Sequence, residues 1–181
     1  MVKALTIFCL LAFFRSLQAH QLSCPFCDNK VLQRQSFYED SLVFGLYTHR
    51  PVVPAHFLVI PKRHVERLEE LTQEELLQVH NALNKIHLLS QKVFSTDPYF
   101  IHQKNGKEVG QSVPHLHFHY IGKKTNDYSI VKFVYNMIRS QFEAPLSHEE
   151  LQKVTDELKT SLEALEMSSK ENSNTLLKLS R

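Results

Sequence analysis

The apolar residues of the chain fall into short β-branched and aromatic runs and into longer segments with helical spacing. Residues 72–94 carry apolar side chains at three- and four-residue intervals, which predicts a helix. Thr72 and Glu75 have the spacing of a capping box at its start. The short runs predict β-strands at residues 41–47, 56–60, 99–102 and 113–121. Together the pattern predicts a single mixed α+β unit.

Two further helices are predicted beyond the last strand, at residues 128–142 and 147–167. This C-terminal helical extension, residues 128–167, could pack on the domain, form a dimer contact or shape substrate access. Residues 168–181 are rich in serine, lysine, asparagine and glutamate, which predicts a frayed or disordered polar tail. The second helix carries an amphipathic stripe formed by Leu151, Val154, Leu158, Leu162 and Leu165.

Residues 1–19 have the order of features found in a secretory signal peptide. A lysine precedes an apolar run at residues 4–14, and the small residue Ala19 follows. Arg15 and Leu17 fit a signal less well, and an N-terminal helix is the alternative. The run is too short to span a bilayer as a helix, so no membrane span is predicted. A cleaved signal would imply export, and otherwise the protein is expected in the cytoplasm.

The composition narrows the classes of function. The 181 residues are enough for one domain with a core, and the 43% hydrophobic and 22% charged content is typical of a globular protein. A formal net charge of +2 is too small for a general nucleic-acid binder, so no nucleic-acid partner is expected. With only four glycines, a glycine-rich phosphate loop is not expected either.

Histidine is the residue type that departs most from background. Of eleven histidines, three fall within five positions as His115, His117 and His119. Alternate side chains of a strand share one face, so the three imidazoles would lie in a row at a spacing of about 6–7 Å. Such a row could bind a metal ion, or it could act at phosphorus with one ring nitrogen as the attacking group. A coincidental cluster on a solvated face is the third alternative.

A second candidate for chemistry lies near the N-terminus, where Cys24 and Cys27 form a Cys-Pro-Phe-Cys motif. Such a pair can be a redox-active dithiol or half of a zinc site, depending on whether two more ligands exist elsewhere. Export would place the pair in an oxidising compartment, where a disulfide is the alternative.

Two motifs of the chain resemble those of the histidine-triad (HIT) family. Asn105-Gly106, Gly110-Gln111-Ser112-Val113 and the run His115–Ile121 are similar to its signature, and Pro54–His64 is similar to its upstream block. The resemblance covers about residues 24–125. It implies a HIT domain at residues 20–127 with an antiparallel sheet, usually as a homodimer. It also implies hydrolysis or transfer at the α-phosphate of a nucleotide.

The resemblance implies a role for each matching residue. His117, the middle histidine, would attack phosphorus and form a nucleotidyl-histidine intermediate that water then cleaves. His119 and His56 would contact phosphate oxygens, His119 more strongly if protonated. Asn105 would donate to the phosphate. The residues implied to hold the non-bridging oxygens or the leaving group are Gln111 and Ser112.

The nucleoside is implied to bind near Leu46 and Thr48. Leu46 would pack on the base. Thr48 stands where many members carry an acidic residue for the ribose hydroxyls, eight positions before His56. A neutral hydroxyl accepts one hydrogen bond but cannot take both hydroxyls of the sugar.

Some branches of the family hold a structural zinc, and the chain has all four matching ligands: Cys24, Cys27, His64 and His115. The resemblance therefore implies a closed Cys₂His₂ site in which His115 is not catalytic, with no metal needed for the chemical step. The expected activity is hydrolysis of a nucleoside phosphoramidate or a dinucleoside polyphosphate. A nucleotide-binding protein with reduced or no catalysis is one alternative, and a zinc-storage or zinc-dependent hydrolytic protein is another.

Overall fold

The computed structural model describes residues 24–127 and 129–179, so the predicted signal peptide lies outside the described residues and stays a prediction. Two elements precede the sheet, the 3-10 helix η1 (Pro25–Cys27) and helix α2 (Asn29–Gln35). The strands are β1 (Ser36–Glu39), β2 (Val43–Tyr47), β3 (His56–Pro61), β4 (Thr96–Gln103) and β5 (Phe118–Lys124). The longer helices are α3 (Gln73–Phe94), α4 (Ile130–Phe142) and α5 (His148–Leu179), with short 3-10 helices η2 (Leu68–Glu70) and η3 (Lys107–Val109).

The five strands form one sheet in the order β1-β2-β3-β5-β4, and every neighbouring pair is antiparallel. This confirms the predicted α+β fold with an antiparallel sheet. Strand β1 and helix α2 were not predicted from the sequence, because four and seven residues are too few to show a clear hydrophobic period.

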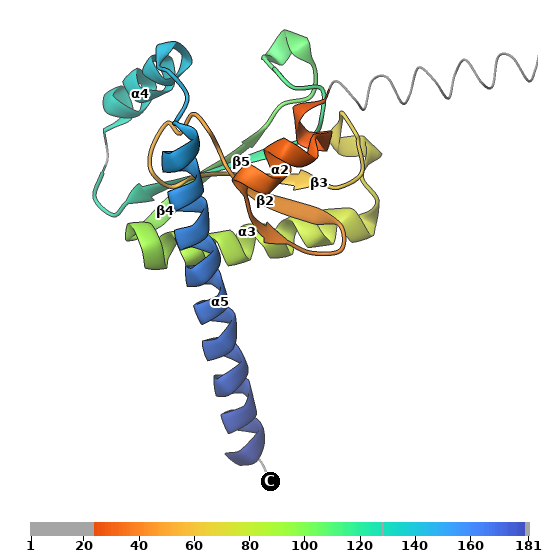
Figure 1. Cartoon of the computed structure of the whole chain (residues 1–181), viewed down its shortest axis with the longest axis vertical. Coiled ribbons are helices and arrows are strands. Elements are labelled where there is room, and N and C mark those ends of the chain that lie inside the picture. Colours follow the sequence, from red (N-terminus) through yellow and green to blue (C-terminus); the bar gives the residue numbers. More distant parts are fainter. Residues whose placement is uncertain (1–23, 128, 180–181) are drawn as a thin grey trace, which may run out of the picture.

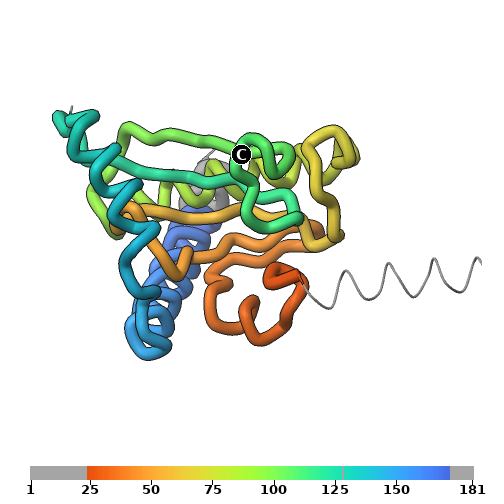
Figure 2. Tube along the Cα trace, turned by 90° about the horizontal axis from the view of Figure 1, so that it is seen from above, coloured from red at the N-terminus to blue at the C-terminus, as the bar shows by residue number. Residues whose placement is uncertain are grey.

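The two faces of the sheet have different roles (Figures 1 and 2). Along β3, Phe57 and Val59 belong to the large core shared with α3 and α5, whereas Leu58 and Ile60 belong to a smaller cluster with Phe26 of η1. Since side chains alternate along a strand, His56 lies on the face of Leu58 and Ile60. The histidines therefore lie on the face opposite α3, beside α2.

The helix predicted at residues 72–94 is confirmed as α3, and both hydrogen bonds of its capping box, between Thr72 and Glu75, are present. Helix α5 corrects the predicted polar tail, because it continues to Leu179 and extends well past the sheet (Figure 1). Residues 168–179 contain no glycine or proline, and their lysines and glutamate favour a helix. No helix among the described residues is long and apolar enough to cross a membrane.

Two strands differ from the prediction in where they begin. The strand predicted at residues 113–121 starts only at Phe118, because Pro114 cannot donate to a ladder and His115 N–H turns back to the Val113 carbonyl oxygen at 2.8 Å. His115 and His117 therefore precede the strand, so strand alternation does not by itself place their rings, although Phe26 contacts both of them and the ring of His117 lies 5.0 Å from that of His119. Strand β4 begins earlier than predicted, at Thr96, and tolerates a proline as an edge strand with a register shift.

Candidate active site

A cavity of about 450 Å³ lies on the histidine face of the sheet, between η1, α2 and the start of α5. The sheet supplies Leu58 of β3 and His119 of β5, which are paired across the two strands. His117 enters from the segment just before β5. The remaining lining residues are Pro25, Phe26, Val31, Arg34, Gln35, Thr48, His49, Ser112, Val113, Leu146, His148 and Leu151.

The ring of His117 is held in one tautomer. Its Nδ1 lies 2.7 Å from the His115 carbonyl oxygen, which can only accept, so Nδ1 carries the proton. Nε2 then holds a lone pair. Burial lowers the pKa of His117, which favours the neutral, nucleophilic ring. The ring of Phe26 packs against it edge to face at 5.3 Å.

Hydrogen bonds also fix the ring orientations of His56 and His119. The backbone N–H of Val52 donates to His56 Nδ1 at 3.1 Å, so the His56 proton resides on Nε2. That proton is donated to His119 Nδ1 at 2.9 Å, which leaves the His119 proton on Nε2. Burial lowers the pKa of His56 to about 3 and that of His119 to about 2. Both rings are therefore neutral near pH 7, so His119 would contact a phosphate as a neutral donor.

These hydrogen bonds change the expected role of His56. Both of its ring nitrogens are already used, and the side chain is buried. His56 therefore orients His119 and does not itself present a nitrogen to a phosphate, whereas Nε2–H of His119 is available as a neutral donor.

Two further candidate residues, Gln111 and Leu46, are placed differently from the expectation. The Gln111 amide accepts from Gly106 N at 2.6 Å and donates to the Glu66 carbonyl oxygen at 2.9 Å, so both of its ends are held within the loop. The side-chain carbonyl oxygen of Asn105 accepts from Leu68 N at 3.1 Å, and this bond does not use the NH₂ group that was expected to donate to a phosphate. Leu46 is fully buried under η1 and α2, so it does not line the cavity.

Thr48 and Ser112 do line the cavity, as expected for residues near a ligand. The Thr48 hydroxyl accepts a long hydrogen bond from Arg50 N at 3.4 Å. No acidic residue lines the cavity with them. Leu58, the neighbour of Leu46 on β3, lines the cavity in its place.

His102 and Lys104, at the end of β4, were not predicted as site residues. The His102 ring lies parallel to His119, with centroids 4.3 Å apart and an interplanar angle of 5°. The charge of Lys104 contributes, after burial, to lowering the pKa of both His102 and His119. His102 reaches the site because it is paired with His119 in the register of β4 and β5. The sequence alone does not give this register.

Replacing His102 tests whether its stacking positions His119. An aromatic pair contributes about 0.5–1.5 kcal/mol, so His102→Ala is expected to lower kcat about threefold to tenfold. His102→Phe keeps the stack and is expected to stay within about twofold of the unchanged protein. Steady-state kinetics measure both, with exposed His80→Ala as the control. Equal losses in the Ala and Phe variants would show that a ring nitrogen matters, and not the stack.

Beside the cavity, Cys24, Cys27, His64 and His115 form a group that could hold a metal ion, with all ligand atoms within 4.8 Å of one another. His115 Nδ1 lies 3.4 Å from Cys24 Sγ, and Cys27 Sγ lies 3.3 Å from His64 Nδ1. Tetrahedral zinc with bonds of about 2.0–2.3 Å would separate neighbouring ligand atoms by about 3.3–3.8 Å. The donor set and its spacing therefore fit the zinc ion that the resemblance implies.

The environment of this group also suits a cation. His115 Nε2 donates to the Pro61 carbonyl oxygen at 2.9 Å, which leaves the Nδ1 lone pair directed at the two sulfurs. Burial, and then the neighbouring Cys24, raise the pKa of Cys27 to about 12. The Cys27 thiol is therefore protonated until a cation stabilises its thiolate form.

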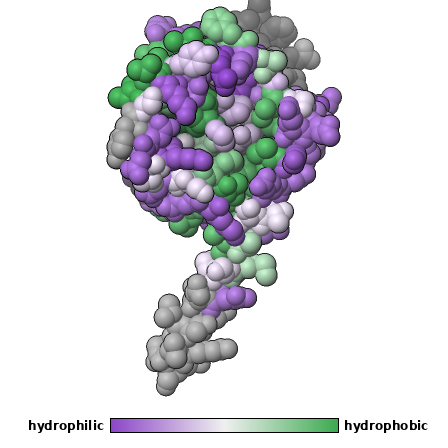
Figure 3. Space-filling model, turned by 90° about the vertical axis from the view of Figure 1, so that its left-hand side faces the viewer, coloured by the Kyte–Doolittle hydropathy of each residue, from purple (hydrophilic) through white to green (hydrophobic). Residues whose placement is uncertain are grey.

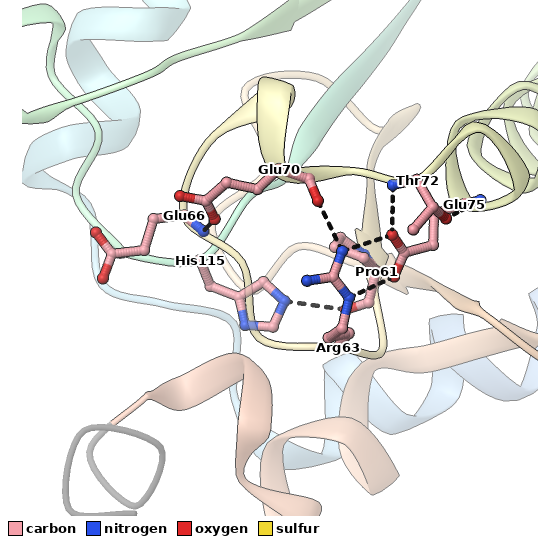
Figure 4. Close-up of polar contacts among 7 residues, drawn as sticks. All are labelled: Pro61, Arg63, Glu66, Glu70, Thr72, Glu75 and His115. Atoms are coloured by element: carbon pink, nitrogen blue, oxygen red, sulfur yellow. Dashed lines mark hydrogen bonds and ion pairs between the residues drawn. The ribbon is translucent and has the colours of Figure 1, made fainter. Parts of the chain in front are cut away.

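An ion pair fixes the loop that follows Pro61 at the end of β3 (Figure 4). Arg63 donates to both carboxylate oxygens of Glu75, at 2.9 and 2.7 Å, and to the Glu70 carbonyl oxygen. Arg63 holds the pKa of Glu75 at about 2. The start of α3 thus anchors the loop on which one ligand and the carbonyl partner of His115 lie.

Comparison with known proteins agrees with this geometry. A model of the HIT domain matches residues 29–126. The bis(5'-adenosyl)-triphosphatase of Dictyostelium discoideum is 35% identical over 129 residues, which cover 71% of this chain and 86% of that protein. The asymmetrical bis(5'-nucleosyl)-tetraphosphatase of Schizosaccharomyces pombe is 38% identical over 102 residues, which are 56% of each chain. A zinc-bound histidine triad family protein from Mycobacterium smegmatis superposes with a TM-score of 0.61 at 22% identity, covering 82% of this chain and 99% of that one.

Proposed function

Since the chain belongs to the histidine-triad (HIT) domain family, we propose that it hydrolyses a nucleotide at the α-phosphate, with His117 as the nucleophile. The observation that carries the proposal is the 2.7 Å hydrogen bond from His117 Nδ1 to the His115 carbonyl oxygen. That bond leaves the Nε2 lone pair free on a ring that lines the cavity. Covalent catalysis of this kind needs no metal at the reacting phosphorus.

The reaction proceeds in two displacements. Attack by His117 Nε2 forms a nitrogen–phosphorus bond, and the bond from phosphorus to the leaving group breaks with its electron pair. Positive charge then develops on the ring, and the His115 carbonyl oxygen stabilises it through Nδ1–H. Water next attacks phosphorus, the electron pair returns to Nε2, and the water proton is released to solvent.

His119 supplies the neutral donor for the transition state. Its Nε2–H can donate to a phosphate oxygen as charge develops there, because His56 fixes the ring orientation. For a leaving group that is an amine, the departing nitrogen takes its proton from solvent, and His119 keeps its Nε2–H as a hydrogen-bond donor.

The nucleoside fits the part of the cavity formed by residues 48–49, β3, α2 and residues 146–151. Leu58 and Leu151 offer apolar surface for a base, and Thr48 offers one hydroxyl for the sugar. The names of the two curated relatives support a dinucleoside polyphosphate as the substrate class. A nucleoside phosphoramidate, with an amine as leaving group, fits the same histidines.

Intact-protein mass spectrometry tests the covalent step. The protein and its His117→Ala variant are exposed briefly to an adenosine phosphoramidate at mildly acidic pH. The proposal expects an adenylyl adduct on the unchanged protein alone. Release of AMP without an adduct at rapid-quench times would instead support direct attack by water.

A second candidate function is nucleotide binding with reduced or no catalysis. It is favoured by the neutral Thr48 and by the lack of any acidic residue lining the cavity. Tight nucleotide binding, measured by calorimetry, with neither an adduct nor AMP release would support this candidate.

Zinc is the metal that best suits the group of Cys24, Cys27, His64 and His115, and we assign it a structural role. Four protein ligands leave no open position for a substrate or water. The bound ion would fix the position of His115, whose carbonyl group holds the catalytic ring.

A homodimer is proposed through the free edge of β4 and the exposed face of α4. Edge strands pair readily with a second strand, and β4 exposes Tyr99, Phe100 and Ile101. On α4, Val131 and Phe142 are 82% and 85% exposed. In Figure 3, which views the side on which α4 lies, apolar side chains gather near the top of this face.

A charged residue on the β4 edge is expected to dissociate this dimer. Ile101→Lys should weaken association at least about 100-fold, because an edge lysine opposes strand pairing and costs apolar burial. Light scattering coupled to gel filtration measures the mass, with the exposed Val109→Lys as the control. A monomeric unchanged protein, or a dimer that survives the substitution, would contradict the proposed interface.

A further inference from the structure

The sheet register separates two sides of the site. Leu58, His119 and His102 lie in one row across β3, β5 and β4. The cavity extends from His119 toward Leu58, and no residue of β4 lines it. A nucleoside in this cavity leaves the β4 side of the histidines for the other substituent on phosphorus, which is the leaving group.

Lys104 follows β4 on this second side. It lies two residues after His102, whose ring is stacked on His119. Its Nζ donates to the Gly110 carbonyl oxygen at 3.3 Å, within the loop that leads to Ser112 at the cavity wall. Gly110 has a φ of 82°, and a Cβ there would lie 3.3 Å from Nζ, so the ammonium rests closely against this loop.

The charge of Lys104 is not neutralised by a nearby carboxylate. Among the described residues, no acidic side chain forms an ion pair with it. The pKa values of His102 and His119 are each lowered, first by burial and also by its charge. An anion on this side would therefore find a cation whose field already reaches the catalytic rings.

We propose that Lys104 binds the phosphates of the leaving group, which makes the protein selective for substrates that release a polyphosphate-containing nucleotide. The proposal rests on the function proposed above and names its substrate class. A lysine is a compact charge on a flexible stem, which suits a phosphate chain that has no fixed plane.

The selectivity follows from where charge develops. When the phosphorus–oxygen bond of a polyphosphate breaks, the electron pair stays on the departing phosphate oxygen and its negative charge grows. Lys104 stabilises that charge in the transition state. When the phosphorus–nitrogen bond of a phosphoramidate breaks, the departing amine takes up a proton and leaves without negative charge. Lys104 then has no anion to bind.

The test compares two substrates on matched variants. Hydrogen bonds to charged groups contribute about 1.5–3 kcal/mol, so Lys104→Gln should lower kcat/KM for diadenosine triphosphate about 10- to 150-fold. The same variant should hydrolyse adenosine phosphoramidate within about threefold of the unchanged protein. Lys107→Gln is the control, because Lys107 is exposed in the same loop and should affect neither substrate.

Each result decides the proposal. A loss confined to diadenosine triphosphate supports it. Equal losses on both substrates would place Lys104 with the histidines and overturn it, and so would the absence of any loss. Failure of the proposed function is recognised separately, because the unchanged protein would then form no adduct with the phosphoramidate.

Discussion

Replacement of His117 by alanine is expected to lower kcat/KM by at least about 10⁴-fold, because the variant lacks the atom that forms the bond to phosphorus. Nucleotide affinity should change little. The cavity is lined mainly by other residues, and removing a neutral ring that lines one wall takes away no charge. The loss is therefore expected in kcat, which reports the covalent step.

Kinetics with diadenosine triphosphate and calorimetry with AMP separate these quantities. The Kd of AMP is expected to stay within about tenfold, since one lost neutral contact corresponds to about 1.4 kcal/mol at most. His80→Ala is the control, because it changes an exposed histidine on α3. A variant that keeps turnover within about 100-fold would show that His117 is not the nucleophile.

The sequence predicted four of the five strands and helix α3, because their hydrophobic periods are long or strongly β-branched. It also predicted the four residues of the metal group, which the fold brings together across 91 positions from Cys24 to His115. That prediction came from matched motifs, since spacing along the chain contains no information on which distant loop meets the cysteines.

The sequence could not predict details that depend on tertiary contacts. Leu46 lies on the expected face, but η1 and α2 cover it, and neither segment shows a period that predicts where it packs. Gln111 belongs to the matched motif, yet its amide is used within its own loop. His102 and Lys104 join the site only because β4 pairs with β5 at one register.

His115 links the metal group to the catalytic ring. Its side chain faces the two sulfurs, and its carbonyl oxygen accepts from His117 Nδ1. Phe26 provides a second link, because it lies between the two cysteines in sequence and contacts both His115 and His117. A change at the cysteines should therefore alter the orientation of His117 without removing any catalytic group.

Loss of one cysteine ligand is expected to have the second large effect, on stability and on activity together. Structural zinc contributes about 10–16 kcal/mol in small zinc-finger peptides. In a domain with its own core we expect Cys27→Ser to lower the free energy of unfolding by at least about 5 kcal/mol. At about 2–4 °C per kcal/mol, Tm would fall by at least about 10 °C.

The measurement combines metal content by mass spectrometry with thermal unfolding, before and after a strong chelator. The unchanged protein should hold about one zinc ion per chain, and chelation should lower its Tm toward that of Cys27→Ser. His64→Cys keeps four ligands and should retain the metal. A purified protein that holds no metal, has a mass 2 Da lower as for a disulfide, and has a Tm unchanged by chelator would contradict the zinc site. Because His115 belongs to both sites, kcat of the unchanged protein should fall on chelation at temperatures where it remains folded.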